Sequence, residues 1–71
     1  MGTRHKWEVA SWGTRWGYVN LDTEMADARV DLVDGRYVVT SFEGEVIGRY
    51  PTLEEAKRKA SKWVKGWWAN Y

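Results

Sequence analysis

Apolar and polar residues alternate over the first two thirds of the chain, and this period-two pattern predicts a series of short β-strands. The alternating segments cover roughly residues 6–12, 15–21, 28–33, 36–42 and 45–50. No internal repeat or low-complexity segment divides the sequence. We therefore expect one small domain, residues 1–71, built on an antiparallel β-meander of four to five strands.

Turn residues separate these segments. Asp34-Gly35 stands between two alternating runs, and Asp-Gly favours the type I′ turn of a two-residue hairpin loop. Glu43-Gly44 and Gly13-Thr14 are the two-residue turns expected for the hairpins on either side. The longer connection DTEMADA, residues 22–28, joins the second predicted strand to the third.

These turns fix a register, in which Val39 faces Val30 on one side and Gly48 on the other, and Ser41 faces Val46. One face of the sheet then collects the apolar side chains Ala28, Val30, Leu32, Tyr37, Val39, Val46 and Tyr50. Gly48 lies in the middle of this face, where it leaves room for a large ring from the opposite layer. In the first hairpin, the side chains that share a face and are expected in the same core are Trp7, Val9, Trp16 and Tyr18.

The C-terminal segment predicts one amphipathic helix over roughly residues 53–68. Thr52 is the expected N-cap, and Glu55 three residues later completes the pattern of a capping box. The apolar stripe of this helix contains Leu53, Ala56, Ala60, Trp63, Val64 and Trp67. We expect Trp63 and Trp67 to point into the core, whereas Trp68 and Trp12 are expected to be partly buried.

Composition limits the ways in which so small a domain can be stabilised. The chain has no cysteine and one histidine, so we expect no disulfide, no metal and no cofactor. Six tryptophans, four tyrosines and one phenylalanine supply large apolar side chains instead. The net charge of +1 gives no global attraction to an anionic partner, and no apolar run approaches the roughly 20 residues of a membrane span. We expect a cytoplasmic protein that does not enter a membrane.

Residues typical of catalysis are missing from the pattern, so we expect no enzyme and no catalytic residue. His5 falls in an N-terminal segment that is expected to be mobile, with its side chain in solvent. Asp22, Glu24 and Asp27 share the longer connection but lack the spacing of an EF-hand, which indicates a solvated loop.

A binding surface is better supported. The outward face of the predicted sheet combines arginines with apolar groups, as recognition surfaces do. Its candidate binding residues are Arg29, Arg36, Val38, Phe42, Ile47 and Arg49. Arginines in this setting also bind phosphates, and the phenylalanine would contact a base or sugar. Asp31 and Glu45 share the face, so a solvated sheet surface with internal ion pairs is the alternative. The apolar part of the face also admits dimerisation, and we expect a monomer or a weak homodimer.

The polar side of the predicted helix is a second candidate. It carries Lys57, Arg58, Lys59, Lys62 and Lys65. Arg58, Lys62 and Lys65 lie opposite the apolar stripe and would bind phosphates in a salt-dependent way. A solvated helix face is the alternative explanation of the same charges.

The segment DGRYVVTSFEGEVIGRYPTLEEAKRKASKWV, residues 34–64, resembles a pattern of small phage and prophage proteins. In that pattern a short antiparallel sheet is followed by a T-x-E-E-A-K helix that packs across it. The order of sheet and helix is also similar to the sheet-type DNA-binding domains of integrases. The first resemblance implies a fold and a phage-like setting, without an assigned activity. The second implies sheet residues such as Arg29, Arg36 and Arg49 in a DNA major groove.

Together these observations predict an α+β domain with one C-terminal amphipathic helix packed on one face of the sheet. The function that we expect is a non-enzymatic binding module of phage-like type, which engages a host or self protein through the exposed sheet face. The first alternative is a small nucleic-acid-binding domain that uses the arginines of the sheet or the basic helix. The second is a structural or designed domain without a ligand.

Overall fold

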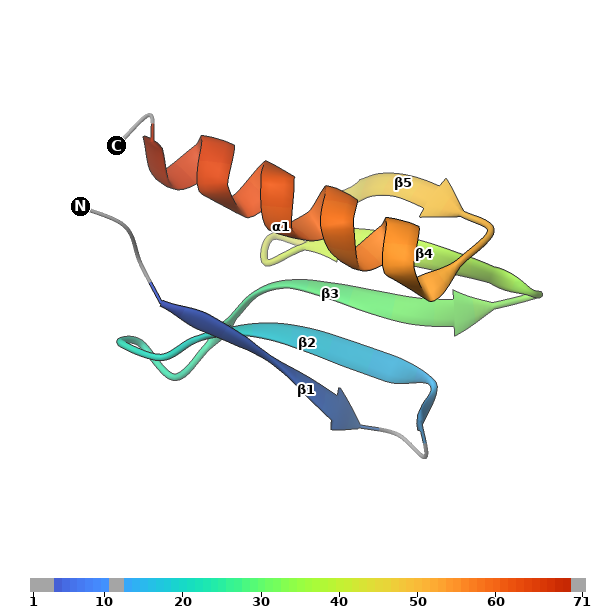
Figure 1. The fold of residues 1–71 in the computed structure, drawn as a ribbon, viewed down its shortest axis with the longest axis horizontal. Coiled ribbons are helices and arrows are strands. Elements are labelled where there is room, and N and C mark those ends of the chain that lie inside the picture. Colours follow the sequence, from blue (N-terminus) through green and yellow to red (C-terminus); the bar gives the residue numbers. More distant parts are fainter. Residues whose placement is uncertain (1–3, 11–12, 70–71) are drawn as a thin grey trace.

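The computed structural model describes residues 4–10 and 13–69. Its five strands are β1 (His5–Ala10), β2 (Arg15–Asn20), β3 (Ala26–Val33), β4 (Arg36–Ser41) and β5 (Val46–Tyr50). One helix, α1 (Leu53–Ala69), follows them. The strands form a single antiparallel sheet in chain order, and α1 packs on one face of it, mainly over β3, β4 and β5 (Figure 1). The predicted α+β fold is confirmed.

Local turn and cap chemistry explains the best-predicted elements. Asp34 and Gly35 have φ angles of 49° and 76°, as a type I′ turn requires, and Val33 pairs with Arg36 beside them. At the start of α1, the hydroxyl of Thr52 accepts a hydrogen bond from the backbone N–H of Glu55 at 3.2 Å. This N-cap satisfies one of the donors that the first turn of a helix leaves unpaired.

The core is a small aliphatic centre surrounded by aromatic rings. The helix contributes Ala56, Ala60 and Val64, all at most 1% exposed, and the two alanines let α1 approach the sheet closely. The sheet contributes Trp16, Tyr18, Ala28, Val30 and Val39. Around this centre lie the partly buried side chains Trp7, Tyr37, Ile47, Tyr50, Leu53, Trp63 and Trp68. The aromatic residues therefore do stabilise the core, mostly from its margin.

Two predictions about the tryptophans have different outcomes. Trp63 packs on the core as expected. Trp67 was expected there too, but it is only half-buried and its ring contacts Phe42 and Trp68, while Trp68 is the one that packs on the core. Trp12 lies outside the described residues.

A β-bulge in the β4–β5 pair changes the face that two residues occupy. Val39 pairs with Gly48 as predicted, but Thr40, not Ser41, pairs with Val46, so Ile47 is an additional residue. The bulge reverses the alternation. Ile47 packs on the core, whereas Val46 is 47% exposed on the face away from the helix. The predicted positions of Ile47 on the outer face and Val46 on the inner face are both wrong.

One predicted hairpin loop is too short. The strands of the third hairpin end at Ser41 and begin again at Val46, so its loop is longer than Glu43-Gly44. The Ser41 hydroxyl accepts the backbone N–H groups of Glu43 and Glu45 within this loop. In the first hairpin the described pair nearest the loop is Ala10 with Arg15. Residues 11–12, which the predicted strand 6–12 includes, lie outside the described residues, so the predicted Gly13-Thr14 turn stays a prediction.

The space at Gly48 is also filled in an unexpected way. A Cβ atom there would lie 2.6 Å from the hydroxyl of Tyr50. The ring that occupies the space above Gly48 is therefore that of Tyr50, two residues further along the same strand, and not a ring of the helix layer.

Candidate functional site

The face of the sheet that α1 leaves uncovered is the candidate binding surface, and we call it the outer face. Its side chains follow from the register, because residues paired across neighbouring strands point to the same side. One row across the sheet joins Arg15, Asp31, Val38 and Arg49, and the next joins Glu8, Gly17, Arg29, Thr40 and Val46. Val33 pairs with Arg36 at the end of the face.

Arginines dominate the charge of the outer face. Arg15 and Arg29 both contact the Asp31 carboxylate, with N–O distances of 2.6 Å to Oδ1 and 3.4 Å to Oδ2. The two arginines thus hold one acid between them, and one positive charge remains in excess. Among the described residues, no carboxylate lies within ion-pair distance of Arg36 or Arg49. The part of the face formed by β4 and β5 is therefore the part with uncompensated positive charge.

The structure brings together most of the predicted binding residues, with two exceptions. Arg29, Arg36 and Arg49 are exposed on the outer face, and half-buried Val38 lies beside Arg49 and Asp31. Ile47 is removed from this group by the bulge described above.

Phe42 is the second exception. It lies in the turn after β4, and its ring meets Trp67 of α1 edge-on at a centroid distance of 5.1 Å. Since α1 covers the opposite face, the prediction that Phe42 belongs to the outer surface is wrong. Glu45 also lies in this turn and outside the strands. The valines of β3, β4 and β5 on the outer face are Val33, Val38 and Val46.

The basic side of α1 forms a separate surface. Arg58, Lys62 and Lys65 are exposed on the helix, on the other side of the molecule from the outer face. Lys57 differs from them, because its ammonium lies 5.5 Å from the centre of the Trp7 ring. This cation–π contact connects the helix to β1, so Lys57 has a structural role.

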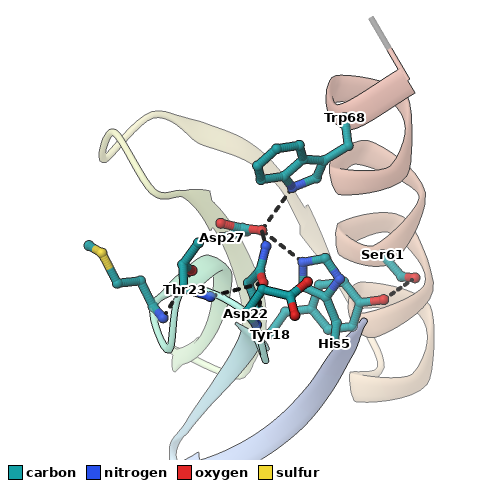
Figure 2. A network of polar contacts seen from close by, with 9 residues as sticks. His5, Tyr18, Asp22, Thr23, Asp27, Ser61 and Trp68 are labelled. Atoms are coloured by element: carbon teal, nitrogen blue, oxygen red, sulfur yellow. Dashed lines mark hydrogen bonds and ion pairs between the residues drawn. The ribbon is translucent and has the colours of Figure 1, made fainter. Parts of the chain in front are cut away.

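A buried polar cluster was missed in the sequence. Figure 2 shows its centre, the carboxylate of Asp27, at the end of the molecule where β1 begins and α1 ends. One oxygen of Asp27, Oδ2, lies 2.7 Å from His5 Nε2, 2.9 Å from Trp68 Nε1 and 3.3 Å from Asn20 Nδ2. Three strands and the helix therefore meet at one carboxylate atom, and we call these four residues the Asp27 cluster.

A second β-bulge places this carboxylate inside. Tyr18 pairs with Ala28 but Val19 pairs with Ala26, so Asp27 is the additional residue on β3 and turns toward the helix side. Asn20 shapes the connection before it: its Oδ1 accepts the backbone N–H groups of Asp22 and Thr23. The expectation of a solvated acidic loop holds for exposed Asp22 and Glu24 and is wrong for Asp27.

The expectation for His5 is wrong as well. His5 begins β1, its side chain is 4% exposed, and its ring stacks on Tyr18 at a centroid distance of 4.5 Å. Tyr18 in turn contacts the Ser61 hydroxyl of α1 at 3.1 Å. With so little of its ring exposed, His5 is placed to hold β1 against the sheet, and the cluster is built as a structural link.

No such link can be recognised from local sequence. The partners of Asp27 lie 22, 7 and 41 residues away in the chain. Asn20 is the closest of them and, as a turn-favouring residue at the end of β2, it gives the one local signal that the connection is ordered. Among the described residues, no three His, Asp or Glu side chains gather in a way that would hold a metal ion. No helix in the described part of the chain is long and apolar enough to cross a membrane.

Comparison with protein-family models, with curated proteins and with solved structures found no match for this chain.

Proposed function

We propose that the protein is a non-enzymatic binding module that engages a host or self protein through its outer face. The observation that supports this most strongly is the composition of that face. All three arginines expected there are exposed on it, Arg15 joins them, and valines lie between them, while the lysines of the chain gather mainly on α1. Enrichment in arginine and depletion of lysine distinguish the centres of protein interfaces from the rest of a protein surface.

The charges indicate the kind of protein surface that fits. Arg36 and Arg49 bring two positive charges without an ion-pair partner among the described residues. Val38 lies between Asp31 and Arg49 in the row across the sheet and gives this region an apolar centre. The partner proposed here is therefore an acidic protein patch with a small apolar contact at its middle.

Nucleic acid is the second candidate, favoured by the same two arginines and by the open sheet that carries them. Proteins that read DNA with strands place such a sheet in a groove, with arginines on phosphates or bases. Asp31 near the centre of the face disfavours this function, because a carboxylate repels phosphate. The corrected position of Phe42 also removes the ring that was expected to contact a base or sugar.

Paired charge-reversal variants test the proposal. Arg36→Glu/Arg49→Glu alters the outer face, and Lys62→Glu/Lys65→Glu is the matched control with the same charge change on the helix. The proposal is supported by a partner that the wild-type chain and the helix variant capture and that the outer-face variant does not. The purified partner should then show the same difference in binding to the three chains. A partner that is retained by the outer-face variant contradicts it.

An NMR titration with a short random-sequence duplex tests the second candidate. Amide shift changes at Arg29, Arg36 and Arg49 that shrink as salt rises would favour nucleic acid over a protein as the partner of the outer face. The absence of shifts at low salt would remove nucleic acid from consideration.

A further inference from the structure

The free edge of β1 offers a site for a second copy of this chain. β1 pairs with β2 alone among the described strands, and the ladder between them has no bulge over its six paired residues. The backbone groups on the outer side of an edge strand are available for pairing with another chain. The other edge, β5, is protected by its bulge, by exposed Arg49 and by Pro51, which follows it directly.

The hydrogen-bond pattern identifies the backbone groups that face the open edge. Arg4 C=O accepts the N–H of Leu21 at 2.9 Å, so this pair is a hydrogen-bonded one. Hydrogen-bonded pairs alternate along an antiparallel ladder, so Lys6 and Glu8 are bonded to β2. Trp7 and Val9 then direct their N–H and C=O groups away from β2, toward the open edge.

Charge favours the register centred on Trp7 over the two registers one residue away. Two identical strands related by a two-fold axis pair antiparallel, and an axis at Trp7 places the two Trp7 residues opposite each other. Lys6 then lies opposite Glu8 of the second copy, and Glu8 opposite Lys6 of the second copy. Moving the axis by one residue places Lys6 opposite Lys6, or Glu8 opposite Glu8, and like charges directly opposite are destabilising.

The side chains of β1 fit this arrangement on both faces of the sheet. Within one chain, Lys6 Nζ already lies 3.1 Å from Glu8 Oε2 on the outer face. Two copies would thus form a group of four alternating charges. On the other face the two Trp7 rings become a cross-strand aromatic pair, and Val9, which is 63% exposed in the single chain, lies beside the second strand.

We propose that the protein forms a two-fold dimer through antiparallel pairing of β1 with β1, in the register centred on Trp7. The two five-stranded sheets then join into one continuous sheet. Because both outer faces lie on the same side of it, the dimer presents two copies of the arginine surface to a partner. The proposal stands independently of what that surface binds.

Analytical ultracentrifugation over micromolar to millimolar concentrations tests the dimer, with charge variants to test the register. Lys6→Glu and Glu8→Lys should each weaken the dimer about tenfold, since each places like charges opposite each other twice. The exchanged double variant Lys6→Glu/Glu8→Lys restores both opposite-charge pairs and should dimerise as the wild type does. Side chains of both residues are more than half exposed, so the variants are expected to fold, which circular dichroism verifies.

Mixing the two single variants gives the most selective result. One copy with two glutamates then meets one copy with two lysines, and the mixed dimer should form more tightly than either variant pairs with itself. A wild-type chain that stays monomeric at millimolar concentration overturns the proposal. So does a dimer whose strength is unchanged by Lys6→Glu and Glu8→Lys, because it must then use another surface.

Discussion

Replacing Asp27 by alanine probes the cluster that joins the N-terminal strand to the end of the helix. The change removes the oxygen that accepts from His5, Asn20 and Trp68. A buried donor left without an acceptor costs about 1–3 kcal/mol. The cost is less than the sum for three donors, because the hydrogen bond from Asn20 is long, at 3.3 Å. The Asp27 side chain is also 13% exposed, so water can take the place of the lost oxygen for some of the donors.

We therefore expect Asp27→Ala to lower the free energy of unfolding by about 3–4 kcal/mol. A domain of this length has a total of only about 4–10 kcal/mol. The variant should thus melt roughly 15–25 °C below the wild type, as followed by circular dichroism on heating. Urea titration gives the free-energy difference directly.

Asp22→Ala is the matched control. Asp22 lies five residues earlier, in the connection that leads into β3, and its carboxylate makes a long, exposed contact with Arg4 at 3.8 Å. Its loss should cost at most about 0.5 kcal/mol, as is usual for surface ion pairs. If the two alanine variants unfold at the same urea concentration, the Asp27 carboxylate is not the buried acceptor described above, and the reasoning fails.

Two further substitutions test the packing. Ile47→Asp should destabilise the fold by about 3 kcal/mol or more, because it puts a charge against the core, whereas Val46→Asp on the outer face should cost less than about 1 kcal/mol. Urea titration of both compares them, and the opposite order would show that the β4–β5 bulge is misplaced. Trp63→Ala removes a partly buried ring packed against the core and should cost about 2–4 kcal/mol, somewhat less than for a fully buried tryptophan. An unfolding free energy within 0.5 kcal/mol of the wild type, roughly the size of a surface change, would contradict the helix–sheet packing.

The parts of the fold that the sequence predicts well are those whose cause is local. The Asp34-Gly35 turn fixes the β3–β4 register through two backbone conformations, and Thr52 marks the start of α1 through a bond within four residues. Helical and strand periods then identify the core face of each element. These signals suffice for the approximate positions of the strands and for the β3–β4 pairing, whereas they leave the number of strands at four to five and do not predict the pairing of β2 with β3.

The parts that the sequence does not predict depend on contacts between distant residues. A bulge adds one residue to a strand, and nothing in the alternation around Asp27 or Ile47 shows where it falls. In VIG, residues 46–48, both Val46 and Ile47 are apolar, so the pattern is consistent with either facing the core. Asp27 turns inward because donors from three other elements meet there, and that meeting exists only in the folded chain.

The same two bulges determine the candidate site. One removes Ile47 from the outer face and puts Val46 there, and the other moves Asp27 from the loop to the interior. The position of Arg29, Arg36 and Arg49 on the outer face was predicted correctly, because they lie on regular parts of β3, β4 and β5. The β3, β4 and β5 part of the outer face presents mainly arginines and valines, with Asp31 as an internal ion-pair partner.

Photo-crosslinking from position 38 tests the proposed binding surface most directly. A photoreactive residue replaces Val38 at the centre of the outer face, and Arg58 on the exposed helix is replaced in a second variant as the control. In cells of the organism that encodes the chain, we predict a discrete adduct with another protein from position 38 and none from position 58. An adduct from position 58 alone, or none from position 38, would contradict the outer face as the binding surface.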